Sequence, residues 1–341
     1  ELTRKCLDAL PHDPRYFTTS VAVTDLEAVR AALGYPSLNL YGISYGSRVA
    51  QHFARRFPDV TRTVILDGVV PPQVSLGPEI ATESQAALER IFTRCAADEA
   101  CDDRFPDVAE SFAGLVAALR EEPVVVSTPD PNTSRYEDIT FGSDEFAAAV
   151  RLLAYHSHSI ALLPLLIHEA ADGNWVPLAS QFRMTAVNLS ESLSIGMHNA
   201  IVCSEDVPFY DRTEIDVDRL AATYIGIVQL NAIETICSIW PAGPVDDAFK
   251  VPVATSIPFM LLSGDADPIT PPRYADLAAV DLGSALHLVG KGQGHGQFSV
   301  GCMPNLLEQF VAAADPGAVE ADCLERAFVM PFFLDFTGPQ P

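Results

Sequence analysis

One serine of this sequence is placed to act as a nucleophile. It is the centre of Gly42-Ile43-Ser44-Tyr45-Gly46, which follows an apolar run and precedes a helical pattern. This strand, turn and helix context is the one that a nucleophile elbow requires. The glycines allow a sharp turn that exposes the Ser44 hydroxyl, and the amide of Tyr45 at the helix start would stabilise an oxyanion. The alternative interpretation is a plain glycine turn without chemistry.

A serine hydroxyl needs a base, and that base needs a carboxylate to orient it. His295 lies between Gly294 and Gly296, directly after a predicted strand, and Asp267 follows the end of the preceding predicted strand. The chain order Ser, Asp, His is that of the α/β-hydrolase arrangement. We therefore predict that Asp267 orients His295 and that Asp265 forms the turn. Both aspartates could instead be turn and capping residues.

The other histidines lack this position after a strand and between glycines. His156 and His158 are close enough in sequence to suggest a metal site, but no third ligand stands near them. No pair of cysteines has the spacing of a zinc finger. The sequence therefore predicts neither a metal nor a cofactor.

Alternating helix and strand patterns flank a long helical stretch and predict a mostly parallel sheet. The expected elements are a helix at 24–33 that begins with a capping box and ends at Gly34, strands at 37–43 and 63–66, and, after the helical stretch, a strand at 259–263, a helix at 273–280, a strand at 285–289 and a helix at 305–313. We predict an α/β-hydrolase core made of 1–74 and 251–341. Residues 75–250 are predicted to be a helical cap inserted into it.

Within the predicted cap, three segments have helical periodicity. Residues 108–119 and 146–153 each form an amphipathic face, and 220–240 is one long apolar helix or a pair of helices. The turn-rich piece at 129–136 is expected to be a surface loop.

The charge balance excludes two classes of partner. With 45 Asp and Glu against 21 Lys and Arg, the formal net charge is −24, and no basic stripe offsets it. Such a chain repels phosphate backbones and anionic lipid headgroups. The longest apolar runs are also far shorter than the ~20 residues of a membrane span. We expect neither nucleic acid nor membranes as partners.

Seven cysteines indicate an oxidising compartment, so a secreted or periplasmic location is expected. Their order along the chain suggests the pairs Cys95–Cys101, Cys203–Cys237 and Cys302–Cys323, and it leaves Cys6 over. Spacing alone does not fix the connectivity. The alternative is a set of buried free thiols in a cytosolic protein.

Four segments together resemble a known family. GISYGS, LLSGDADPITPP, the QGHGQFSVGC stretch that ends at Cys302, and the later Cys323 look like the secreted tripeptidyl aminopeptidase branch of the proline iminopeptidase-like α/β-hydrolases. The resemblance runs from about Tyr16 to Cys323. It implies a serine exopeptidase with Ser44, Asp267 and His295 as its triad. It also implies a helical cap that limits substrates to short peptides or free N-termini.

An enzyme that acts at a free N-terminus must hold an ammonium group, and a carboxylate in a partly dry cap would do so. Glu205 and Asp206 are the candidates, because the segment Ser204-Glu205-Asp206 adjoins Cys203 and precedes an apolar segment. Cap glutamates have this task in proline iminopeptidase-like enzymes. The alternative is a solvated acidic turn.

The sequence departs from the family at its start. Only about 36 residues precede the elbow strand, whereas three or four βα units need on the order of 80–120. A His-Gly-Gly-Pro-like loop, which donates the second oxyanion amide in these hydrolases, is missing. We therefore expect this chain to be the C-terminal portion of a longer enzyme. Cys6 is a candidate to link it to the missing segment or chain.

Three functions remain open. The first is a peptidase that releases residues or short peptides from free N-termini. The second is a carboxylesterase or acyltransferase that uses the same triad on a small ester, because the fold does not define the acyl group. The third, a binding protein without activity, is disfavoured by the intact triad.

Overall fold

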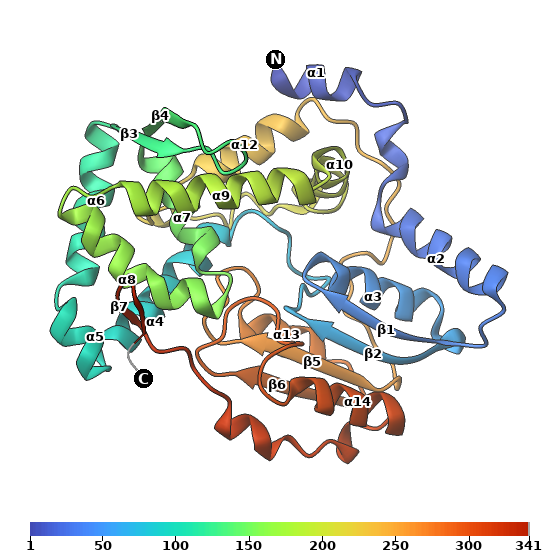
Figure 1. Cartoon of the computed structure of the whole chain (residues 1–341). Helices are drawn as coiled ribbons and strands as arrows, with labels where there is room; N and C mark the ends of the chain where they lie inside the picture. Colours follow the sequence, from blue (N-terminus) through green and yellow to red (C-terminus); the bar gives the residue numbers. More distant parts are fainter. Residues whose placement is uncertain (340–341) are drawn as a thin grey trace. The chain divides into compact units, whose positions relative to one another are not determined.

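A computed structural model describes residues 1–339, apart from the side chains at positions 190 and 339 (Figure 1). The chain divides into two compact units. The first contains Glu1–Ile80, Ser194–Asp216 and Val228–Phe328, and the second contains Ala81–Leu193, Val217–Ile227 and Val329–Pro341. The three stretches of the first unit include all the residues predicted to carry chemistry.

The first unit is built on a parallel sheet of four strands. In spatial order these are β1 (Leu38–Ile43), β2 (Thr61–Asp67), β5 (Phe259–Gly264) and β6 (Ala285–Gly290). Every neighbouring pair is parallel, so the carboxyl ends of the four strands lie at one edge of the sheet. The four predicted strands and the parallel arrangement are confirmed.

Helices cover both faces of this sheet, as its strand sequences require. Alternate residues of a strand point to opposite faces. Val64 and Leu66 therefore pack in one core with α2 (Thr19–Leu33), α3 (Tyr45–Arg56) and α13 (Pro272–Ala279). Ile65 between them packs in the other core with α14 (Met303–Ala313). Two-sided burial explains why the central strands are almost continuously apolar.

The helix before β1 begins earlier than its sequence signal indicated. The predicted capping box at Thr24 is wrong, because α2 already starts at Thr19 and the Thr24 hydroxyl donates to the Ser20 carbonyl. Glu27 pairs with Arg30 instead of reaching back to the helix start. The predicted end is confirmed, since Gly34 follows with φ 70° and caps the helix.

The first unit also contains part of the predicted cap. Helices α10 (Ile195–Glu205) and α12 (Val228–Cys237) come from that predicted cap. Together with α1 (Leu2–Asp8), from the predicted core, they pack around Ala200 and Trp240. The compact units thus differ from the predicted division at 75 and 250. The reason is that contacts with residues 1–80, distant in sequence, hold 194–216 and 228–250 in this unit.

The second unit is mainly helical. Its helices are α4 (Ile80–Ala96), which starts at the boundary, α5 (Glu99–Arg104), α6 (Val108–Glu121), α7 (Ser143–Leu153), α8 (Ser157–Ala171), α9 (Val176–Ser192) and α11 (Val217–Ala221). The predicted apolar faces of α6 and α7 are buried. An unexpected antiparallel hairpin of β3 (Val124–Pro129) and β4 (Tyr136–Phe141) flanks the predicted loop. A second small hairpin, β7 (Phe333–Asp335) with β8 (Gly338–Pro339), ends the described part.

The three predicted disulfides, Cys95–Cys101, Cys203–Cys237 and Cys302–Cys323, are confirmed. Among the described residues Cys6 is a free thiol, half-buried against the cluster around Trp240. Its link to another segment or chain stays a prediction.

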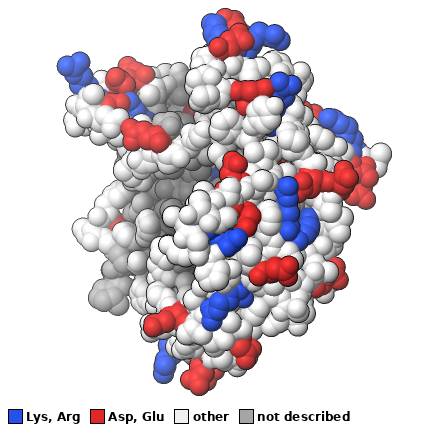
Figure 2. All heavy atoms as spheres, turned by 90° about the vertical axis from the view of Figure 1, so that its right-hand side faces the viewer, with Lys and Arg blue, Asp and Glu red and all other residues white. Residues whose placement is uncertain are grey.

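In residues 1–339 no helix combines the length and the apolar character of a membrane span. On the face drawn in Figure 2, acidic and basic side chains are interspersed.

Candidate active site

Ser44 occupies a strained turn between β1 and α3. Its φ of 55° and ψ of −123° make it one of three non-glycine residues with positive φ in the described part of the chain. Such backbone strain costs about 1–3 kcal/mol and concentrates at functional sites. Gly42 is required beside it, because a Cβ there would lie 2.1 Å from the carbonyl oxygen of Gly46. A Cβ at Gly46 would meet nothing within 4 Å, so the turn itself depends on Gly42.

His295 and Asp267 are in direct contact. The Nδ1 atom of His295 lies 2.7 Å from Oδ2 of Asp267, which is fully buried. Burial alone would raise the pKa of Asp267, but the attraction of His295 and the hydrogen bonds from His295 and Thr270 hold it below its ordinary value. Asp265 instead accepts the amide of Gly292 at 2.7 Å. The structure therefore brings Asp267 to the imidazole.

The imidazole lies over the end of β2, next to the elbow. A Cβ on Gly68, the residue after β2, would lie 2.7 Å from Cε1 of His295. Ile43, the residue before the serine, lies beside Gly296, because a Cβ there would be 3.0 Å from Cδ1 of Ile43. Since β1 and β2 are neighbours, the three predicted triad residues gather at one edge of the sheet. Their catalytic roles stay predictions.

Thr270 is a part of this site that sequence reasoning missed. Its hydroxyl donates to Oδ2 of Asp267 at 2.6 Å, and its Oγ1 lies 3.1 Å from Nδ1 of His295. Its amide donates to Oδ1 of Asp267 at 3.0 Å, as does that of Ile269 at 2.8 Å. The carboxylate is thus fixed by donors besides the imidazole. The only sequence signal was a threonine three residues after the aspartate, which is typical of any turn.

We expect Thr270→Val to slow acyl transfer about fivefold, because one hydrogen bond that fixes Asp267 is worth about 1 kcal/mol. The rate at which a fluorophosphonate labels Ser44 measures this directly. Thr270→Ser keeps the hydroxyl and is expected to react at close to the wild-type rate. Equal rates for the valine and serine variants would remove the hydroxyl from the site.

Glu205 and Asp206 are not a solvated turn, because both are buried at the end of α10. Oε1 of Glu205 accepts the amide of Thr19 at 2.5 Å, and Oε2 accepts its hydroxyl at 2.9 Å. The same Thr19 hydroxyl lies 2.9 Å from the hydroxyl of Tyr45. One threonine therefore links Glu205 to the residue after Ser44. Burial raises the pKa of Glu205 to about 7, against the lowering effect of Thr19 and Arg48.

Asp206 is the partner of a buried arginine. Its two oxygens lie 2.8 and 3.1 Å from the guanidinium nitrogens of Arg48, and the amide of Leu76 donates to it at 2.9 Å. Lys250 lies 3.4 Å away. The same guanidinium lies 3.7 Å from Oε2 of Glu205, so both carboxylates share one buried arginine, an arrangement typical of a structural ion pair. Substrate binding by Glu205 or Asp206 stays a prediction.

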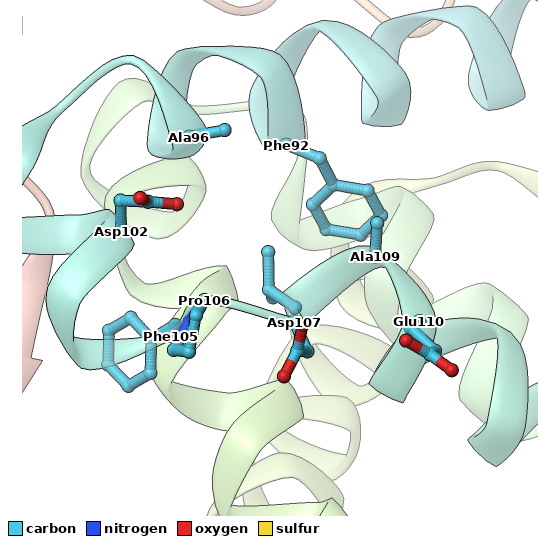
Figure 3. A pocket seen from close by; sticks show the side chains of 9 residues that line it. Phe92, Ala96, Asp102, Phe105, Pro106, Asp107, Ala109 and Glu110 are labelled. Atoms are coloured by element: carbon cyan, nitrogen blue, oxygen red, sulfur yellow. The ribbon is translucent and has the colours of Figure 1, made fainter.

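A pocket of about 200 Å³ lies in the second unit (Figure 3). Nine residues between positions 92 and 110 line it, including the rings of Phe92 and Phe105 and the carboxylates of Asp102, Asp107 and Glu110. None of the predicted site residues is among them. We therefore assign this pocket no part in the chemistry. Among the described residues no group of His, Cys, Asp and Glu side chains is arranged to hold a metal ion.

Two family models match this chain. The model of the TAP-like proteins matches residues 222–323, and that of the alpha/beta hydrolase fold matches residues 7–139. The first match contains Asp267 and His295, and the second contains Ser44. The matches therefore cover the stretches that form the candidate site.

Curated relatives include two peptidases. The serine protease Hip1 of Mycobacterium tuberculosis is 28% identical over 83% of this chain and 56% of its own length. The tripeptidyl aminopeptidase of Streptomyces coelicolor is 23% identical over 95% of this chain and 60% of its own length. The chain thus spans little more than half the length of these relatives. The solved esterase from Exiguobacterium antarcticum aligns with 88% of this chain and 75% of its own at 13% identity and a TM-score of 0.40, a similarity too weak to bear on the fold or the site.

The parallel sheet, the elbow at its edge and the two family matches agree with one another. On this evidence the chain is similar to the TAP-like proteins and to the α/β hydrolases over the residues that form the candidate site.

Proposed function

We propose that this protein is a serine hydrolase that works through an acyl-enzyme. One observation carries the proposal: a strained serine and an aspartate-paired histidine lie at the same edge of one parallel sheet. The names of the relatives, a serine protease and a tripeptidyl aminopeptidase, support it. Three disulfides support a secreted or periplasmic location.

In the proposed mechanism each residue has one task. With Nδ1 of His295 donating to Asp267, Nε2 is the nitrogen left to accept the proton of Ser44. The freed serine oxygen attacks the substrate carbonyl, and the amide of Tyr45, the first residue of α3, donates to the oxyanion. His295 then gives the proton to the leaving group. A water molecule, activated by the same imidazole, releases the acyl group from Ser44.

For the substrate we propose short peptides with a free N-terminus. The argument is that Glu205 is linked through Thr19 to Tyr45, which adjoins the nucleophile. A buried carboxylate is a strong partner for a substrate ammonium group, because charge-assisted hydrogen bonds are strengthened away from water. The alternative, a carboxylesterase or acyltransferase, uses the same triad and needs no such carboxylate.

Glu205→Gln separates these two functions. On a free-amine peptide we expect kcat/KM to fall about tenfold or more, since a hydrogen bond to a charged group contributes about 1.5–3 kcal/mol. On the N-acetylated analogue we expect little change. Glu214→Gln, at an exposed position of the same unit, is the matched control. Equal losses on both substrates, or none, would favour the esterase.

The pH dependence of wild-type enzyme tests the same group. The pKa of Glu205 near 7 leaves it neutral below that pH, where it attracts an ammonium group less. The ratio of kcat/KM for the free-amine peptide to that for its N-acetylated analogue should therefore fall as the pH drops through about 7. Protonation of His295 affects both substrates alike and cancels in this ratio. A ratio independent of pH would exclude Glu205.

A further inference from the structure

Asp67, the last residue of β2, contacts both sides of the candidate catalytic site. Its backbone carbonyl accepts the amide of Ser44 at 2.8 Å. Its carboxylate accepts the amide of Gln297 at 2.8 and 2.9 Å and that of Phe298 at 3.0 Å. These two amides come two and three residues after His295. A single residue therefore joins the nucleophile turn to the histidine loop.

A fully buried carboxylate is costly unless donors surround it. Burial raises the pKa of Asp67, and the hydrogen bonds from Tyr41, Gln297 and Phe298 act in the opposite direction. The hydroxyl of Tyr41, on β1, also donates to this carboxylate, at 2.8 Å. All these donors belong to the elbow strand or to the loop that carries the imidazole. The carboxylate thus serves to connect these two segments.

The histidine loop needs such an anchor because of its composition. It contains Gly292, Gly294 and Gly296, and two of them have positive φ, 64° and 86°. Glycines give the loop backbone more freedom than other residues would. The side-chain amide of Gln297 closes the loop on itself by donating to the carbonyl of Gly294 at 2.7 Å. Gln297 and Phe298, which follow these glycines, donate their amides to Asp67. These hydrogen bonds tie the loop to β2, the strand that ends beside Ser44.

We propose that Asp67 is a positioning residue that holds the loop of His295 in a fixed position relative to Ser44. The proposal rests on the proposed serine-hydrolase function. A displacement of about 1 Å at a catalytic group can cost about 10²-fold in rate, so an anchor of this kind has a measurable effect. Asp67 does not act on the substrate. It acts through the positions of the imidazole and the serine.

The carboxylate of Asp67 also has an electrostatic effect on the imidazole. Among the described residues, the titratable groups that face the carboxylate of Asp67 are Tyr41 from β1 and His295 from the histidine loop. Asp267 also contacts the imidazole. A negative charge nearby favours the imidazolium. Replacing Asp67 by asparagine removes this charge, so His295 should lose its proton at a lower pH. The acid limb of the pH profile should shift in that direction.

The test is the rate at which a fluorophosphonate labels Ser44 in the full-length protein, measured from acid to neutral pH. For Asp67→Asn we expect labelling about tenfold slower or more, with the acid limb displaced to lower pH. Asp59→Asn, an exposed carboxylate in the 3₁₀ turn before β2, is the matched control and should label as wild type does. A purely structural role would lower thermal stability without displacing the acid limb.

The outcomes are distinct. A folded Asp67→Asn variant with the wild-type rate and acid limb overturns the proposal. If that variant does not fold, Tyr41→Phe removes one donor from the carboxylate at a half-exposed ring, and we expect its labelling to be about two- to fivefold slower. An unchanged rate in Tyr41→Phe would then overturn it. If wild type is not labelled at all, the proposed function fails and the inference fails with it.

Discussion

Ser44→Ala should lower turnover by roughly 10⁴-fold or more, because removing a member of such a triad leaves only the oxyanion donor and substrate binding. The alanine variant should also fail to react with a fluorophosphonate. Alanine keeps the Cβ atom of serine, so the backbone strain at φ 55° is the same in the variant as in the wild type. Mass spectrometry of the labelled protein and steady-state kinetics on an aminoacyl nitroanilide are the measurements.

The control for this prediction is a serine outside the site. Ser238→Ala replaces an exposed serine of the same unit and should leave the labelling unchanged. Labelling that persists in Ser44→Ala would assign the nucleophile elsewhere. If the Ser44→Ala variant still hydrolyses the nitroanilide although its labelling is lost, the peptidase activity does not depend on Ser44.

The sequence predicted the four strands of the sheet because each is a short apolar run bounded by turn residues. It also predicted the chain order of the triad, since that order is visible without coordinates. The hairpin of β3 and β4 was missed, because its turn of residues 129–136 was read as an isolated loop and the pairing strands were not seen on either side of it. The start of α2 was missed because Thr24 and Glu27 imitate a capping box within the helix.

What could not be predicted depends on contacts between residues far apart in sequence. The amide of Gln297 donates to Asp67 across 230 positions, and the amide of Thr19 donates to Glu205 across 186. A backbone amide has no sequence signature, so neither contact could be inferred from residue types. Thr270 is close to Asp267 in sequence, yet only the structure distinguishes its hydroxyl from that of an ordinary turn residue.

The choice between the two aspartates shows what the structure adds. Asp265 and Asp267 stand in the same turn, and from the sequence either one could orient the histidine or form the turn. In the structure one carboxylate accepts a loop amide and the other contacts the imidazole. The two substitutions Asp265→Asn and Asp267→Asn therefore form a matched pair.

Asp267→Asn should lower turnover by about 10⁴-fold while the protein stays folded. The carboxylate accepts the Nδ1 proton of His295 and stabilises the imidazolium that forms when Ser44 is deprotonated. An asparagine amide is nearly the same size, but its NH₂ group can donate toward Nδ1 and favour the tautomer whose Nε2 carries the proton. That nitrogen then cannot accept the serine proton. The hydrogen bonds from Ile269 and Thr270 can still reach the amide oxygen, so the turn should persist.

Turnover, the rate of fluorophosphonate labelling and the thermal unfolding temperature of the two asparagine variants test this assignment. Asp265→Asn keeps an oxygen that accepts the amide of Gly292, so we expect its rate to stay within about tenfold of wild type. A folded Asp267→Asn protein with a rate near wild type would transfer the orienting role to another carboxylate. A large loss in Asp265→Asn alone would identify that carboxylate. Losses of equal size in both variants, with equal falls in unfolding temperature, would mean that the turn as a whole, not one carboxylate, supports His295.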